Sequence, residues 1–80
     1  MRKPVVMPAV GAASAVVSVW YVRPGERVYA GDRLVEVLVG GATFEVPSPT
    51  TGILAEKWAF PDERLTPGQV LGVVEENDTV

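Results

Sequence analysis

Glycine and proline recur at short intervals along the whole sequence, and this spacing limits the chain to short secondary-structure elements. The 80 residues include eight glycines and seven prolines. Because both residues are unfavourable inside helices, a helix of ordinary length does not fit between them. The intervening runs are rich in valine, isoleucine, threonine and aromatic residues, which favour strands. The pattern predicts an all-β domain of short strands joined by turns.

Eight strands are expected from these runs. They lie at Val5–Met7, Ala15–Val22, Arg27–Tyr29, Leu34–Val39, Thr43–Val46, Gly52–Ala59, Arg64–Thr66 and Val70–Glu75. A chain of this length is the size of one small domain. We therefore interpret residues 1–80 as a single domain, with a core at about 4–75 and an acidic tail at 76–80.

The pair Gly40-Gly41 stands between two of the strand-like runs. Both central positions of a type I′ turn need a positive φ, which glycine adopts without steric cost. The sequence therefore predicts a two-residue hairpin turn with a tight tip at Gly40-Gly41.

The second half of the sequence repeats the first at an offset of 37 residues. Residues 24–37 align with residues 61–74, and six of the fourteen positions are identical. The shared proline, glycine, glutamate and arginine argue against a chance match between valine-rich strands. Each half supplies roughly four strands, too few to close a core alone. Two copies related by a pseudo-two-fold axis are expected to form a flattened barrel or sandwich, with the chain ends close together, opposite or beside the hairpin.

The composition excludes most catalytic chemistry. The sequence contains no histidine and no cysteine, so it has no imidazole base, thiolate nucleophile, Cys/His zinc site or disulfide. The paired carboxylates Asp62-Glu63 and Glu75-Glu76 lie in segments expected to be exposed. We expect no catalytic residue, no metal ligand and no enzyme activity.

Charge and hydropathy limit the partners. The net charge of −3, with scattered basic residues, does not suit a nucleic-acid surface. The longest run free of glycine, proline and charge is Ala12–Val22, eleven residues, and a membrane-spanning helix needs about 20. Pro4 and Pro8 interrupt any apolar signal segment. The sequence predicts a cytoplasmic domain without nucleic-acid binding or membrane insertion.

Five segments together carry a family likeness, in order and without gaps. They are Val5–Pro8, Arg23–Val28, Ala30–Val37, Thr43–Gly52 and Gly68–Leu71. They resemble the lipoyl domain of the 2-oxo acid dehydrogenase acyltransferases; biotinyl carrier domains share the fold, but their Met-Lys-Met signature is absent. The likeness spans about positions 4–75 and implies a barrel-sandwich hybrid of two four-stranded antiparallel sheets with an exposed prosthetic-group lysine at a hairpin tip.

The sequence departs from this family at the tip itself. Where the family has Asp-Lys-Ala, this chain has Gly40-Gly41-Ala42, so the resemblance places the lipoyl-lysine position at Gly41. Lipoylation forms an amide with a lysine ε-amine, and glycine has no side chain to acylate. The acidic residues that often flank the family's lysine are missing, and Leu38, Val39 and Gly40 stand in their places. No cofactor is expected on this chain. Lipoate is expected only if the tip lysine is restored, for example by placing Asp-Lys at 40–41.

The chain has two lysines elsewhere, Lys3 and Lys57. We interpret Lys57 as a solvent-facing strand residue and Lys3 as part of a mobile N-terminal arm. A ligase that reads a hairpin apex has no reason to accept either, so neither is expected to carry lipoate or biotin.

Three functions fit this pattern. We favour a lipoyl-like domain that is not lipoylated and serves as a structural or protein-interaction module, with partners among 2-oxo acid dehydrogenase components or a related complex. A second possibility is a dihydrolipoamide acyltransferase-like swinging-arm carrier whose tip lysine was changed, which a lysine codon at position 41 in the gene would identify. A third is a membrane-fusion-type barrel-sandwich adaptor that seats a partner on the hairpin edge.

The remaining notable residues receive structural interpretations. At least one of Trp20 and Trp58 is expected to fill the core, with the other left exposed. Glu75, Glu76 and Asp78 are interpreted as a solvated acidic end.

Two recurring features are assigned to turns. The Glu-Arg pairs at 26–27 and 63–64 are expected to serve turn chemistry and exposed ion pairs, with pairing across the pseudo-axis as the alternative. Pro47–Gly52 is interpreted as the fixed turn between the two halves.

Overall fold

The computed structural model describes residues 1–9 and 14–76. This part of the chain contains eight strands and no helix. The strands are β1 (Arg2–Val6), β2 (Ala15–Trp20), β3 (Arg27–Val28), β4 (Arg33–Val39), β5 (Ala42–Pro47), β6 (Gly52–Lys57), β7 (Arg64–Leu65) and β8 (Val70–Glu76). Every expected strand is present, with ends shifted by three residues or fewer. The all-β prediction is confirmed.

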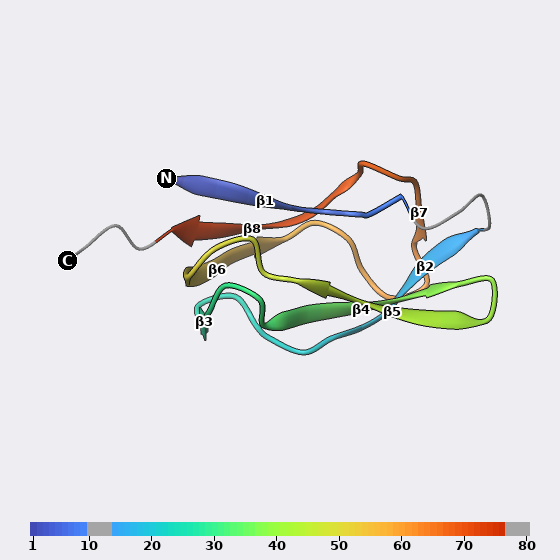
Figure 1. Cartoon of the computed structure of the whole chain (residues 1–80), viewed down its shortest axis with the longest axis horizontal. Coiled ribbons are helices and arrows are strands. Elements are labelled where there is room, and N and C mark those ends of the chain that lie inside the picture. The colour runs from blue at the N-terminus through green and yellow to red at the C-terminus, as the bar shows by residue number, and fades with distance from the viewer. Residues whose placement is uncertain (10–13, 77–80) are drawn as a thin grey trace.

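The strands form two four-stranded antiparallel sheets. One sheet has the order β1-β8-β6-β3 and contains both described ends of the chain, so we call it the terminal sheet. The other has the order β5-β4-β2-β7, and we call it the hairpin sheet. The N-terminus lies at one end of the molecule and the turn between β4 and β5 at the opposite end (Figure 1). The sequence left open whether the ends lie opposite or beside the hairpin, and the structure places the ends of the described part, Met1 and Glu76, opposite the hairpin.

The core lies between the two sheets and repeats with the sequence. Its largest fully buried side chains include three pairs separated by 37 residues: Val17 with Leu54, Leu34 with Leu71, and Val37 with Val74. Each such burial stabilises the fold by roughly 1.5–3 kcal/mol relative to exposure. Both halves therefore contribute equivalent residues to one shared core.

The backbone repeats the same two-fold relation. Adding 37 to the bounds of β2, β3 and β4 gives the bounds of β6, β7 and β8. Register shifts fall at equivalent places, between Val17 and Val19 in β2 and between Leu54 and Glu56 in β6. A positive φ of 68° at Asp62 occurs at the position equivalent to Gly25, where φ is 97°. The repeat seen in the sequence is a structural repeat.

Glutamate side chains close equivalent turns in the two halves. Glu26 Oε1 accepts a hydrogen bond of 2.7 Å from the backbone N–H of Arg23. Glu63 Oε1 accepts one of 2.9 Å from the backbone N–H of Phe60. The interpretation of these glutamates as turn residues is confirmed.

The N-terminal segment is a strand, and the interpretation of Lys3 as part of a mobile arm is wrong. Lys3 lies in β1 opposite Val74 of β8. The reason is the two-fold relation: β5 completes the hairpin sheet beside β4, and β1 fills the equivalent edge beside β8. The expected start of this strand was too late because Pro4 suggested a break, although an edge strand tolerates proline.

The expected strand at Val70–Glu75 extends one residue further than predicted. Glu76, the first residue of the expected acidic tail, belongs to β8. Glu75 Oε2 lies 3.0 Å from the N-terminal amine, and Glu76 Oε2 accepts a 2.9 Å hydrogen bond from Thr50 Oγ1. Asp78 and the rest of the expected tail after Glu76 lie outside the described residues.

The connection between the halves is the expected turn, since β5 ends at Pro47 and β6 begins at Gly52. The buried Ser48 hydroxyl donates a 2.6 Å hydrogen bond to the carbonyl of Thr50. Glycine is required at 52 because a Cβ there would overlap the Glu75 carbonyl oxygen. The turn is therefore held by its own hydrogen bonds and by close contact with β8.

Candidate functional site

The candidate site is the tip of the β4–β5 hairpin. Val39 and Ala42 are the last paired residues, which leaves Gly40 and Gly41 as a two-residue turn. Their φ angles are 55° and 87°, both in the left-handed region that a type I′ turn requires. The predicted tight hairpin tip is confirmed.

The tip presents backbone to solvent. Gly40 and Gly41 are exposed, and a Cβ built on Gly41 would meet no atom within 4 Å. The Gly40 N–H donates a 3.4 Å hydrogen bond to the Ser14 carbonyl, which links the turn to the residue before β2. Position 41 therefore has room for a side chain but a backbone conformation that favours glycine.

Neither lysine lies at the tip. Lys57 is the last residue of β6 and faces Gly72 of β8, as expected for a strand residue. Its Nζ lies 5.7 Å from the centroid of the Trp20 ring, a cation–π distance. Both Lys3 and Lys57 are in the terminal sheet, whereas the turn belongs to the hairpin sheet and lies at the end of the molecule opposite the N-terminus (Figure 1).

The two tryptophans have the expected different roles. Trp20 packs against the core and donates a 2.8 Å hydrogen bond from Nε1 to the Ala59 carbonyl. Trp58 is 50% exposed and donates from Nε1 to Glu56 Oε1, also at 2.8 Å. Trp20 therefore fills the edge of the core, and Trp58 remains on the surface.

A polar cluster that was not expected from the sequence lies on the hairpin sheet. The Tyr21 hydroxyl oxygen is 3.1 Å from both Glu36 Oε2 and Glu45 Oε2. Arg33 Nη1 lies 3.3 Å from Glu45 Oε1, and its guanidinium carbon lies 5.1 Å from the Tyr21 ring centroid. Desolvation, followed by the hydrogen bonds to Glu45 and Glu36, raises the pKa of Tyr21 to about 12.

Register counting from the turn could have found part of this cluster. Once Val39 faces Ala42, Glu36 must face Glu45 across the hairpin, as the structure shows. The position of Tyr21 could not be found in this way because it depends on the β2–β4 register shift after Val17.

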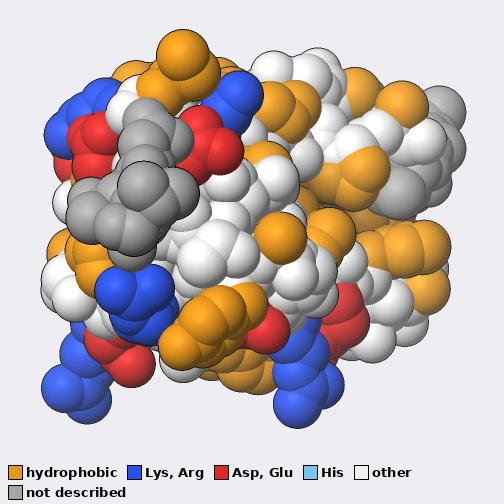
Figure 2. Space-filling model, turned by 60° about the vertical axis from the view of Figure 1, so that its left-hand side comes forward, with side chains coloured by type: hydrophobic (Ala, Val, Ile, Leu, Met, Phe, Trp, Pro, Cys, Tyr) orange, Lys and Arg blue, Asp and Glu red, His pale blue; other side chains and the backbone are white. Residues whose placement is uncertain are grey.

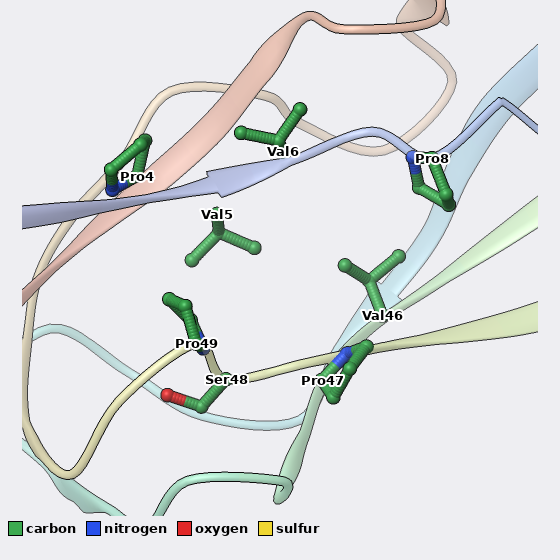
Figure 3. A pocket seen from close by; sticks show the side chains of 8 residues that line it. All are labelled: Pro4, Val5, Val6, Pro8, Val46, Pro47, Ser48 and Pro49. Carbon is green, nitrogen blue, oxygen red and sulfur yellow. The ribbon is translucent and has the colours of Figure 1, made fainter.

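A mostly apolar groove of about 270 Å³ lies between the edge strands β1 and β5 (Figure 3). Its lining residues are Pro4, Val5, Val6, Pro8, Val46, Pro47, Ser48 and Pro49. The Ser48 hydroxyl is already bound to the Thr50 carbonyl. The groove therefore lacks the set of convergent polar groups that orients a small ligand.

No other candidate chemistry emerges from the described residues. Over residues 1–9 and 14–76, no group of three or more Asp or Glu side chains could hold a metal ion. In the same part of the chain, no helix is long and apolar enough to cross a membrane.

The fold and the exposed hairpin define a lipoyl- or biotinyl-type domain, and comparison with known proteins agrees. The biotin/lipoyl family model, described as biotin-requiring enzyme, matches residues 3–74. The chain therefore belongs to this family. No curated protein matches the chain.

Among solved structures, the chain is similar to the lipoyl domain of the 2-oxoglutarate dehydrogenase complex from Azotobacter vinelandii. The match has a TM-score of 0.74 at 23% sequence identity and covers 92% of this chain and 98% of that one. At this identity the likeness shows the fold, which confirms the predicted pair of four-stranded sheets. The assignment of Gly41 to the attachment position remains a prediction.

Proposed function

We propose that this domain is a non-lipoylated structural or protein-interaction module related to 2-oxo acid dehydrogenase complexes. The observation that carries the proposal is the two-glycine turn at the tip of the β4–β5 hairpin. A carrier of this family needs a primary amine at the hairpin apex, and Gly41 supplies no side chain.

The surroundings of the tip support this proposal. The exposed residues next to the turn are Leu38, Ala42 and Thr43, and none of them carries an amine. Lys57 projects near Trp20 from β6, and Lys3 belongs to β1. Attachment at either lysine would place the prosthetic group on a sheet, without the projecting hairpin that lets a swinging arm reach separate active sites.

We also infer that the domain is not an enzyme by itself. Lipoyl domains present a group to catalytic partners and do not perform the chemistry. The sequence contains no histidine or cysteine, and Glu36 and Glu45 are bound to Tyr21 or Arg33 on an open sheet face. Residues 1–9 and 14–76 therefore offer no enclosed acid–base site.

One observation favours a second candidate, a swinging-arm carrier whose tip lysine was changed. The space around Gly41 would accept a lysine side chain without a clash, since no atom lies within 4 Å of its Cβ position. The gene distinguishes the two candidates, because a lysine codon at position 41 would restore the carrier.

The test uses purified components of a 2-oxo acid dehydrogenase complex and a labelled 2-oxo acid. We expect the chain to co-sediment with at least one component and to remain free of acyl label, while a lipoylated domain in a parallel sample becomes labelled. Acyl label on this chain would overturn the non-carrier assignment. Failure to co-sediment with every component would overturn the proposed partner class.

A further inference from the structure

The outer side of β5 is an unpaired strand edge. β5 pairs with β4 on one side only and ends the hairpin sheet. In Figure 1 the half of β5 next to the turn lies at the border of the molecule, with no strand drawn beyond it. A free edge presents backbone N–H and C=O groups with which another strand can pair.

The hairpin turn determines which groups of β5 are free. The pair that flanks a two-residue turn, here Val39 and Ala42, is hydrogen-bonded, and bonded pairs alternate with non-bonded pairs from there. Val37 and Phe44 form the next bonded pair, so the backbone N–H and C=O of Thr43 and Glu45 point away from β4. Among the backbone hydrogen bonds that the described residues make outside the sheets, none involves Thr43 or Glu45. β5 therefore offers free donors and acceptors in the middle of an exposed edge.

The internal repeat shows that this edge lacks a protection that its counterpart has. In the terminal sheet, Pro4 of the edge strand β1 lies opposite Val73. In the hairpin sheet, Glu45 of β5 lies opposite Glu36, which precedes Val73 by 37 positions. Pro4 and Glu45 are thus equivalent edge residues, and proline has no N–H with which to accept an added strand. The same fold closes one edge with proline and leaves a free N–H at the equivalent place on the other.

The free groups of β5 are complementary to those of a second β5 strand. When two copies pair antiparallel about a two-fold axis at Phe44, Thr43 of each lies opposite Glu45 of the other, and each such pair exchanges both N–H···O bonds. A shift of one residue would bring the free groups against residues that already bond to β4.

Shifts of two residues are also unfavourable. In one direction the two Glu45 carboxylates would lie directly opposite each other, which destabilises a sheet. In the other direction Glu45 would lie opposite Gly41, whose φ of 87° is not that of a strand. The register centred on Phe44 is therefore the one that the edge favours.

The side chains around this axis suit the same pairing. Phe44 is 37% exposed, and the axis brings it opposite Phe44 of the copy in a non-hydrogen-bonded pair, where side chains approach most closely. Glu45 Oε1 already lies 3.3 Å from Arg33 Nη1, so its carboxylate enters the contact with a cation beside it. On the face that Figure 2 shows, charged side chains gather toward the end that carries the N-terminus and are fewer toward the other end.

We propose that the β5 edge binds the β5 edge of a second copy of this chain, and that antiparallel pairing centred on Phe44 joins the two hairpin sheets into one continuous sheet. A contact centred on Thr43–Glu45 is smaller than the roughly 1,200 Å² that stable interfaces bury, so the dimer is weak and reversible. The pairing does not depend on the proposed function, because the turn at Gly40-Gly41 stays outside it.

The test follows the amide chemical shifts and amide hydrogen exchange of the unaltered chain from about 10 μM to about 1 mM, a range that detects weak association. We expect concentration-dependent shifts at Thr43, Phe44 and Glu45. Exchange of the Thr43 and Glu45 amides should become slower as the concentration rises. Exchange of the Phe44 amide should not change, because that N–H already bonds to β4.

Thr43→Glu and Thr43→Lys form a matched pair of variants, because the proposed register places residue 43 opposite Glu45 of the copy. Both symmetric pairs change at once, so glutamate is expected to weaken the dimer and lysine to strengthen it, each by about 2- to 30-fold. Thr66→Glu and Thr66→Lys make the same charge changes at an exposed residue beyond β7, the other edge of this sheet, and should leave the association unchanged. If a Thr43 variant disturbs the whole amide spectrum, Glu45→Pro, which copies Pro4, replaces it and should weaken the association.

Three results would overturn the proposal. They are the absence of self-association at about 1 mM, concentration-dependent shifts confined to other strands, and Thr43 variants that change the association in the same direction or not at all. None of these results bears on acyl labelling, so a failure of this proposal and a failure of the proposed function can be distinguished.

Discussion

Replacing Gly40-Gly41 with Asp-Lys is expected to create a lipoylation site at a limited cost in stability. A Cβ at position 41 meets nothing within 4 Å, so lysine does not clash. The cost comes from the backbone, because position 41 keeps a φ near 87°. A residue with a side chain loses roughly 1–2 kcal/mol in the left-handed region, and aspartate at position 40 is among the residues that tolerate it best.

This cost is small compared with the stability of the domain. Scaling by length gives roughly 4–12 kcal/mol for a chain of this size. A loss of 1 kcal/mol lowers the Tm of such a domain by about 4–8 °C. We therefore expect the variant to remain folded, with a Tm lower by roughly 4–16 °C.

The assay combines thermal unfolding, followed by circular dichroism, with intact mass after incubation with a lipoate ligase. Gly40→Asp with Gly41→Ala is the matched control, because it carries the same backbone penalty at both positions without an amine. We expect both variants to lose stability and only the Asp-Lys variant to gain the mass of one lipoyl group. An unchanged Tm in both variants would contradict the assigned turn conformation. A folded Asp-Lys variant that stays unmodified would show that other features that a ligase recognises have also been lost.

Three further predictions concern the core and the surface charges. Leu54→Ala is expected to lower the free energy of unfolding by about 2–5 kcal/mol, because Leu54 is fully buried. Urea titration measures this change, and a loss below about 1 kcal/mol would contradict the place of Leu54 in the core. In a Tyr29→Phe background, the phenolate absorbance of Tyr21 should titrate near pH 12, and Glu45→Gln should lower this value. Since the folded pKa exceeds the ordinary value of 10.0, Tyr21 should contribute stability that is lost as the pH rises from 10 to 12. Hydrogen bonds from Arg2 and then Trp58 hold the pKa of Glu56 below its usual 4.5, so the stability that ionised Glu56 contributes is present above pH 4.5 and lost as the pH falls through the folded pKa. Arg2→Gln should make this acid-induced loss of stability shallower, and an unchanged pH dependence would contradict the ion pair.

The sequence was sufficient for the features that depend on local chemistry and on the repeat. Gly40-Gly41 predicted the hairpin turn because few other residue pairs adopt two successive positive φ angles. The identities between residues 24–37 and 61–74 predicted the two-fold relation, and the structure extends it to equivalent bulges in β2 and β6.

The features that failed depend on pairing between distant segments. Lys3 has no local signal for a strand, and it belongs to one because β1 pairs with β8 at the edge of the terminal sheet. The Tyr21 cluster requires β2 to approach β4 with a register shift after Val17, which residue spacing does not encode.

The most direct test of the central claim is the intact mass of the unaltered chain after co-expression with a lipoate ligase, measured beside the Asp-Lys variant. The account predicts an unchanged mass for the chain with the Gly40-Gly41 tip and a gain of one lipoyl group for the variant. A lipoyl gain on the unaltered chain, located by peptide mapping at Lys3 or Lys57, would contradict it.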